Sequence, residues 1–248
     1  MEVITSSPQI VKVQTERVSQ PLRAFVLQAA REYRDKFAER LLRKELRKPW
    51  MKYREIGIIE DLLKAMRPMR VLEWGAGYGT LHFARLLPPG SQWIALEHDR
   101  AWAERIRSHR KEKDGRVRIH DAPPESEDWR SRDADGTYSD FRTYVDLPEK
   151  FGPYDFILVD GRARESCLEK AHGLLAPGGV AVLHDANRSF RRAPGGLFPS
   201  EAEFRDYRRW SGGLWIGSKD RPLSTLLDLG RHGRIWRMYN SLGKGFHL

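Results

Sequence analysis

Residues 70–80 have the sequence RVLEWGAGYGT, and this stretch decides the fold. Its first five residues form a short apolar run of the kind that becomes a buried parallel strand. Gly75, Gly77 and Gly79 follow at alternate positions, where glycine lets the backbone turn tightly and approach a ligand closely. The segment Thr80–Leu87 has a helical pattern, and the N–H groups at its start would face the same ligand. We therefore predict a strand, a ligand-binding loop and a helix.

Strand-like and helix-like segments alternate in the rest of the chain. This alternation predicts an α/β protein with a Rossmann-like, doubly wound, mainly parallel sheet. Two late strands, at 213–219 and 234–240, would bring the sheet to seven strands, and 201–210 is predicted to be a helix. Ligands of such sheets bind at the carboxyl ends of the strands. The other predicted strands are 91–97, 116–120, 154–160 and 179–185.

The two ends of the chain and one internal segment are expected to lie outside the repeating pattern. Residues 1–51 are predicted to form an N-terminal helical extension, with a lead-in that ends at Pro21 and a helix over about 22–48, before a domain at 52–248. This amphipathic helix would cover the core or pair with a second subunit, giving a homo-oligomer. Residues 122–150 are polar and rich in Pro, Asp and Ser, and we interpret them as an insertion loop. With 187–212, this loop would cover a second substrate.

The loop after the first strand resembles the first motif of the class I S-adenosylmethionine-dependent methyltransferases, E/D-x-G-x-G-x-G. A dinucleotide fingerprint fits less well, because the third glycine comes one position early and an acid precedes the loop. The resemblance extends over about 52–185 and implies the sheet order 3-2-1-4-5. It also implies which residues bind the methionine, ribose and adenine parts of the cofactor: Glu73, Trp74, Gly75, Ala76, Gly77, Tyr78, Gly79, Glu97, His98, Asp121, Ala122 and Asp160.

Acidic residues also follow the fourth and fifth predicted strands. Asp160 and Asp185 would lie about 4.8 Å apart if these strands are neighbours. Together with Asn187 they could hold a divalent cation such as Mg²⁺, as in the metal-dependent O-methyltransferases, although Ala186 interrupts the Asp-Asn pair of that family. Without a metal, His184 or Asp160 could take a proton from the acceptor as a general base. The candidate catalytic residues are therefore Asp160, His184 and Asp185.

The formal net charge of +10 is unevenly distributed along the chain. Residues 1–56 carry a net +6, residues 57–185 a net −3 and residues 186–248 a net +7. Basic flanks attract anions, which favours an anionic acceptor or a nucleic acid as partner. Nucleic acid is the second choice, because no Asn-Pro-Pro-Tyr-like motif follows the fourth strand. Arginines that could bind an anionic acceptor follow the fourth and fifth strands: Arg162, Arg164, Arg188, Arg191 and Arg192.

Composition limits the remaining classes of protein. The chain has 248 residues and no apolar run that approaches the roughly 18 residues of a membrane span. Cys167 is the only cysteine, which excludes an internal disulfide and favours the cytoplasm. We predict an S-adenosylmethionine-dependent methyltransferase that acts on a hydroxyl of a small molecule, such as a sugar or a natural product. The alternatives are an RNA or DNA methyltransferase and a non-catalytic cofactor-binding scaffold. An aminopropyl transferase is disfavoured, because its paired acids after strand four are missing.

Overall fold

A computed structural model describes residues 8–41, 43, 46–109, 115–132, 135–188, 197–208 and 211–246. The chain divides into two compact units, one made of residues 1–46 and 228–248 and the other of residues 47–227. The candidate site lies in the second unit, which holds the sheet.

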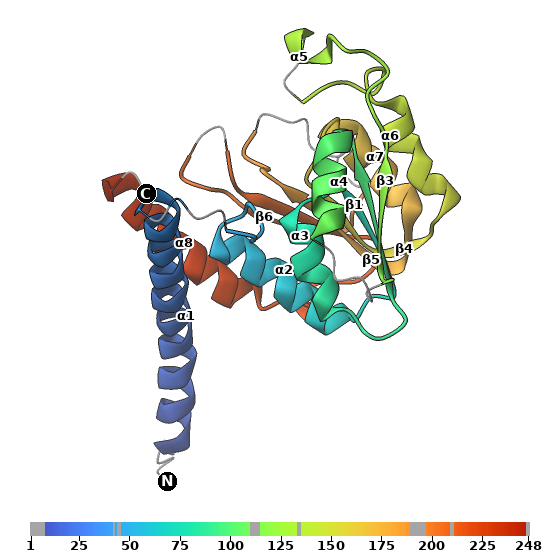
Figure 1. Ribbon diagram of the computed structural model, residues 1–248. Coiled ribbons are helices and arrows are strands. Elements are labelled where there is room, and N and C mark those ends of the chain that lie inside the picture. The colour runs from blue at the N-terminus through green and yellow to red at the C-terminus, as the bar shows by residue number, and fades with distance from the viewer. Residues whose placement is uncertain are drawn as a thin grey trace. The chain divides into compact units, whose positions relative to one another are not determined.

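The second unit is built on a seven-stranded sheet in the order β3-β2-β1-β4-β5-β7-β6 (Figure 1). The first five strands run parallel to one another, and β7 is antiparallel to both β5 and β6. The predicted fold class and the order of the first five strands are therefore confirmed. The strands are β1 (Arg70–Trp74), β2 (Gln92–Glu97), β3 (Val117–Asp121), β4 (Tyr154–Val159), β5 (Leu175–His184), β6 (Ser200–Phe204) and β7 (Leu214–Ser218).

Helices cover both faces of this sheet, which explains why its central strands are mostly apolar and buried. Figure 1 shows α2 (Tyr53–Met66), α3 (Tyr78–Phe83) and α4 (Arg100–Ser108) on one face, and α6 (Arg142–Asp146) and α7 (Arg164–Leu174) on the other. The short helices η1 (Ala84–Leu86), η2 (Leu147–Lys150) and η3 (Leu223–Thr225) lie in connections.

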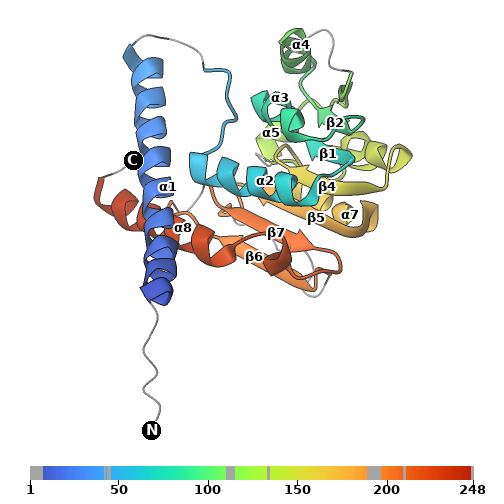
Figure 2. The same ribbon diagram turned by 90° about the horizontal axis from the view of Figure 1, so that it is seen from below.

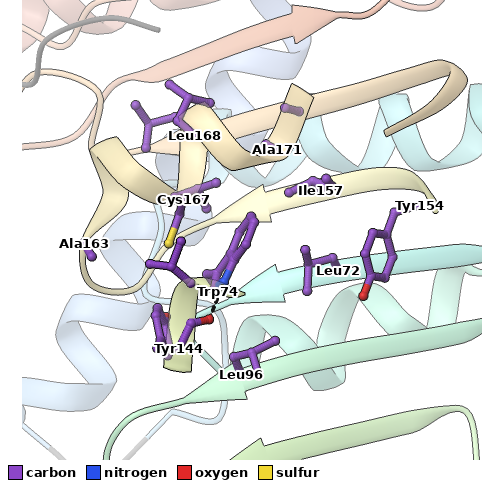
Figure 3. Packing of buried hydrophobic residues seen from close by; sticks show 14 of the residues in the cluster. Leu72, Trp74, Leu96, Tyr144, Tyr154, Ile157, Ala163, Cys167, Leu168 and Ala171 are labelled. Atoms are coloured by element: carbon purple, nitrogen blue, oxygen red, sulfur yellow. Dashed lines mark hydrogen bonds between the residues drawn. The ribbon is translucent and has the colours of Figure 1, made fainter. Parts of the chain in front are cut away.

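The core beneath α6 and α7 fixes the strand ends that form the site. In Figure 3, Cys167 and Ala171 of α7 lie over Ile157 of β4 and Leu72 of β1. Trp74 is fully buried here, and its indole N–H donates to the carbonyl of Tyr144 at 2.9 Å. Because the register pairs Trp74 with Leu96 and with Val159, the chain leaves β1, β2 and β4 at one common edge.

The segment 122–150 is more ordered than its polar composition predicts. It contains α5 (Trp129–Arg132), α6 and η2, and residues 133 and 134 lie outside the described part. Five of its apolar side chains are buried in the core cluster: Ala122, Trp129, Phe141, Tyr144 and Val145. The insertion therefore supplies core as well as surface.

Two predictions near the C-terminus are wrong. Residues 201–204 belong to strand β6 and not to a helix. Exposed Glu201 and Glu203 alternate in this strand with half-buried Ala202 and buried Phe204, and Glu201 accepts a hydrogen bond from the indole of Trp215 on β7 at 3.1 Å. Residues 234–240 lie in helix α8 (Leu229–Phe246) and not in a strand. Ile235, Trp236 and Tyr239 are buried at helical spacing, and such short apolar runs do not distinguish helix from strand.

The first unit pairs α8 with the long helix α1 (Pro8–Leu41), as Figures 1 and 2 show. The ring centroids of Phe25 and Tyr239 lie 4.8 Å apart in an edge-on contact. Pro21 lies inside α1, so the predicted lead-in that ends at this proline is wrong. In the described part of the chain, none of the helices combines the length and the apolar character that crossing a bilayer needs.

Candidate active site

A pocket of about 450 Å³ lies at the carboxyl ends of β1, β2, β4 and β5. This volume is within the usual range for small-molecule sites. The pocket is lined by most of the residues that the sequence singled out: Glu73, Gly75, Ala76, Gly77, Tyr78, Gly79, Glu97, His98, Asp160, His184 and Asp185. The structure therefore brings the glycine loop and the acids of three other strand ends together.

Gly75 allows the loop to pass directly against the end of β4. Its φ is +104°, and a Cβ at this position would lie 2.5 Å from the carbonyl oxygen of Asp160. The N–H of Gly75 donates to the carbonyl of Leu96 at 2.9 Å, which fixes the loop to β2 as well. By contrast, a Cβ on Gly77 would meet only the backbone nitrogen of Gly79, at 3.9 Å. Gly75 is therefore needed by the fold, whereas Gly77 leaves space in the pocket.

Glu73 is a buried acid in the pocket wall. Its Oε2 accepts hydrogen bonds from the hydroxyl of Thr80 at 2.6 Å and from the indole of Trp93 at 2.8 Å. Burial raises the pKa of Glu73 to about 8, against the opposing effect of these two donors. A positively charged ligand group in the pocket would stabilise the ionised form. The position therefore suits a cation, as the sequence indicated.

Glu97 closes β2 beside the glycine loop. Its Oε1 accepts hydrogen bonds from the backbone N–H groups of His98 and Asp99, both at 2.9 Å, so the turn after the strand orients the carboxylate. The side chain is 4% exposed and lines the pocket. The ring of His98 meets Trp129 and Phe141 edge-on, in both cases with 5.8 Å between centroids. A carboxylate that is fixed through one oxygen can accept hydrogen bonds from ligand hydroxyl groups through the other.

His184 lies between two carboxylates. Its Nδ1 is 2.7 Å from Oδ1 of Asp160, and its Nε2 is 3.3 Å from Oε2 of Glu55. Burial lowers the pKa of His184, but the charges and hydrogen bonds of Asp160 and Glu55 outweigh burial and raise it well above the usual value. At neutral pH the ring is therefore an imidazolium that donates from both nitrogens, which leaves it no lone pair for a base.

Glu55 itself is held from three sides. It is 1% exposed and belongs to α2. Besides His184, it accepts hydrogen bonds from the backbone N–H groups of Lys52 at 2.7 Å and of Gly213 at 3.2 Å. Helix α2 is also tied to the segment before β7 by a buried ion pair between Arg54 and Asp206. Glu55 is therefore held rigidly, and its contact with His184 fixes the position of the imidazole ring.

The acids at the ends of β4 and β5 are paired with arginines. Asp185 accepts from the N–H of Gly212 at 2.6 Å and from Arg188 at 2.8 Å, and its pKa is lowered despite burial. Arg164 is 5% exposed and donates to Asp135 at 2.7 Å, while its second nitrogen lies 3.7 Å from Asp160. Arg191 and Arg192 lie outside the described residues.

Four of the singled-out residues do not line this pocket. Trp74 points into the core, and Ala122 is buried there too. Asp121 is exposed and forms an ion pair with Arg107. The amide of Asn187 is turned toward the backbone of 206 and 208, with its Nδ2 2.8 Å from the carbonyl of Asp206.

These contacts do not fit the proposed magnesium site. Asn187 is directed elsewhere, and Asp160 and Asp185 already pair with His184 and Arg188. In the ranges that the structure describes, no group of three or more His, Cys, Asp and Glu side chains has an arrangement that could hold a metal ion.

Sequence reasoning missed several residues of the site. Glu55 is 129 positions from His184, and only the packing of α2 brings the two together. Trp102 donates from its indole to the carbonyl of Ala76 at 2.8 Å, and its ring lies 4.9 Å from that of Trp50, so both form an aromatic wall beside the loop. The only sequence signal for this wall is the presence of Trp in short polar segments.

Comparison with known proteins shows the fold. No protein-family model matches the chain, and no curated protein matches it in sequence. Among solved structures, the chain is similar to an O-methyltransferase from Bacillus cereus in complex with SAH, with 17% identity, a TM-score of 0.51 and coverage of 88% of this chain and 93% of that one. A spermidine synthase in complex with the transition-state analogue AdoDATO shows 16% identity, a TM-score of 0.51 and coverage of 79% and 75%. TomG, an O-methyltransferase from Streptomyces achromogenes in complex with SAM, shows 20% identity, a TM-score of 0.48 and coverage of 66% and 79%.

Proposed function

We propose that this protein is an S-adenosylmethionine-dependent methyltransferase that methylates a hydroxyl group of a small molecule. The chain has the fold of the class I methyltransferases, and a glycine loop with two buried acids lines one pocket at the expected strand ends. The single observation that carries the proposal is Glu73, a buried acid in the wall of that pocket whose pKa is raised to about 8. A buried acid with a shifted pKa in a pocket is typical of a functional site, and a cationic ligand group would stabilise its ionised form.

The residues of the pocket fit this cofactor. Glu73 would bind the cationic amino group of its methionine part, and Glu97 would accept hydrogen bonds from the ribose hydroxyls. Gly77 leaves room for close approach. When bound, S-adenosylmethionine supplies a methyl group on a sulfonium, which is reactive toward an oxygen nucleophile.

Asp160 is the group that would receive the acceptor's proton. Among the described residues, both His184 and Arg164 contact its Oδ1, so Oδ2 remains available to a hydroxyl. His184 fixes the carboxylate in place, and Glu55 fixes His184. We therefore assign His184 and Glu55 as positioning residues and Asp160 as the base. Since the pocket does not fit a divalent cation, the proposed reaction uses no metal.

Calorimetry tests the proposal directly. S-adenosylmethionine and S-adenosylhomocysteine should both bind the wild-type protein, and Glu97→Ala should weaken both by at least tenfold. Arg118→Gln is the control, because Arg118 is exposed on β3 and does not line the pocket. Equal binding by wild type and Glu97→Ala would remove Glu97 from the site, and no binding by wild type would reject the function.

A transfer assay then separates the alternatives. Cofactor carrying a labelled methyl group should label small hydroxyl acceptors from a mixed panel. Binding without transfer to any member would favour a non-catalytic scaffold. Transfer from decarboxylated cofactor to an amine would favour the aminopropyl chemistry that the name of the spermidine synthase implies for that protein.

A further inference from the structure

The pocket has two chemically different halves. Glu97 and Asp99 line it at the end of β2, while Arg162 and Arg188 line it after β4 and β5. In the sheet order, β2 and β5 are three strands apart, which corresponds to about 14 Å. The acids at the end of β2 and the arginines after β4 and β5 therefore line the pocket on opposite sides of the glycine loop, and Asp160 and Asp185 line it on the side of the arginines.

Arg162 lines the pocket together with Arg164 and Arg188. Its guanidinium is 5.1 Å from the ring centroid of Trp129, a position typical of a cation–π contact. Its pKa is lowered, first by burial and then by the positive charge of Arg164, with a further contribution from Arg188; Asp135 acts in the opposite direction. Like charges gathered in a partly buried pocket disfavour one another, and an anion placed among them would relieve that cost.

The surrounding contacts hold these arginines in defined positions. Asp185 accepts from Arg188 at 2.8 Å, and Asp135 accepts from Arg164 at 2.7 Å. Arg164 lines the pocket but is nearly buried, whereas the side chain of Arg188 is 37% exposed. Ordered guanidinium groups bind oxyanions by paired hydrogen bonds at little further entropic cost.

We propose that Arg162 and Arg188 form a subsite for an oxyanion group, a carboxylate, phosphate or sulfate, carried by the small-molecule acceptor. The subsite would anchor the acceptor at the ends of β4 and β5, with its hydroxyl directed to Oδ2 of Asp160. This inference rests on the proposed function and specifies its substrate class: hydroxylated acids or phosphate esters.

Binding of simple anions to the complex with S-adenosylhomocysteine tests the subsite without turnover. Sodium phosphate, sulfate and 3-hydroxybenzoate are titrated separately at constant ionic strength set with chloride. We expect at least one of them to raise the melting temperature or to give a calorimetric isotherm. Arg162→Gln and Arg188→Gln should each weaken this binding by about tenfold or more, and Arg118→Gln should leave it unchanged. The best of the three anions identifies the group.

The outcomes separate the two levels of inference. If S-adenosylhomocysteine binds but no anion does, or if Arg162→Gln binds anions as well as wild type, the subsite is wrong and the methyltransferase proposal stands. If S-adenosylhomocysteine does not bind, the methyltransferase proposal fails. Tight binding of a 20-nucleotide RNA that depends on Arg162 would also overturn the assignment, because the anion would then belong to a nucleic acid.

A competition assay adds a second readout. With labelled cofactor, hydroxybenzoic acids should be methylated at least tenfold more efficiently, in kcat/KM, than their methyl esters. Arg162→Gln should abolish this preference by raising KM for the acids, and Arg162→Lys should restore part of it, because the charge remains but the paired geometry is lost. Equal rates for acids and esters in wild type would contradict a carboxylate subsite. The anion titrations described above would then decide whether the subsite binds phosphate or sulfate.

Discussion

We predict that cofactor binding depends on pH through the raised pKa of Glu73. Burial raises this pKa to about 8, so the free protein at neutral pH holds Glu73 mainly in its neutral form. If the cationic amino group of the cofactor binds at this acid, it selects the ionised form. Binding at neutral pH must then release a proton, and affinity must fall as the pH falls.

The magnitude follows from the two ionised fractions. With a pKa of about 8, roughly 9% of Glu73 is ionised at pH 7 and roughly 1% at pH 6. The affinity for S-adenosylmethionine should therefore be about ninefold lower at pH 6 than at pH 7, which is about 1.3 kcal/mol. In this range an α-amino group, with a pKa of roughly 7.7 to 8.0, remains mostly protonated, so the ligand adds little to the dependence.

Calorimetry at one pH in two buffers of different ionisation enthalpy measures the number of protons released on binding. At pH 7 we expect a net release of about 0.8 proton per S-adenosylmethionine bound, because Glu73 loses about 0.9 and the ligand amine takes up about 0.1. Glu73→Gln is the matched variant: it keeps the size of the side chain but cannot ionise. It should bind more weakly at pH 7, release no proton and show a nearly flat profile between pH 6 and 7.

The same substitution has an opposite effect on stability. A carboxyl group with a raised folded-state pKa contributes stability below about pH 4.5, and this contribution is lost as the pH rises toward 8. Glu73→Gln should therefore raise the melting temperature relative to wild type more at pH 8 than at pH 5. Proton release by the Gln variant equal to that of wild type would refute the assignment of the titrating group to Glu73.

Three further predictions concern the rest of the site. Gly75→Ala should lower the free energy of unfolding by roughly 1 to 3 kcal/mol in urea titrations, because the new Cβ would lie 2.5 Å from the Asp160 carbonyl oxygen at a φ of +104°. Gly77→Ala should instead keep wild-type stability and lose cofactor affinity. Glu55→Gln should lower the pKa of His184 in nitrogen NMR titrations of the free protein, and it should add an inflection near neutral pH to the profile of kcat; an unchanged pKa would separate Glu55 from His184. Mg²⁺ titrated into the complex with S-adenosylhomocysteine should give no binding heat, and EDTA should leave methyl transfer within about twofold of the untreated rate; loss of activity that Mg²⁺ restores would re-establish a metal site.

The predictable part of the site is the part encoded locally. The strand-loop-helix around residues 70–80 and the acids at 97 and 160 follow from the alternation of apolar runs with glycine and acid. The sheet order then brings these ends to one edge, because the register of neighbouring parallel strands leaves little freedom. Such features could be placed before the structure was known.

The unpredicted part depends on long-range packing. Glu55 lies in the first turn of an amphipathic helix, where an acid is commonly solvated, yet its carboxylate is 1% exposed. The amide of Asn187 points to the backbone of 206 and 208, a contact that spacing along the sequence cannot indicate. Similarly, the segment 234–240 was predicted as a strand from a short run rich in apolar residues, but it buries Ile235, Trp236 and Tyr239 as a helix face.

Local compensation of charge explains why the net charge of the chain is a poor guide to this pocket. In the half near β4 and β5, Asp160, Asp185 and Asp135 are paired with His184, Arg188 and Arg164, so the acids there are matched by cations. Glu73 in the other half is satisfied by neutral donors from Thr80 and Trp93, and its charge is left for a ligand. The half with Glu73 therefore suits a cation, and for the half near β4 and β5 we propose an anion bound at Arg162 and Arg188. The sum of acids and bases over the chain removes this local contrast, so the proposed difference between the two halves can be argued only from the structure.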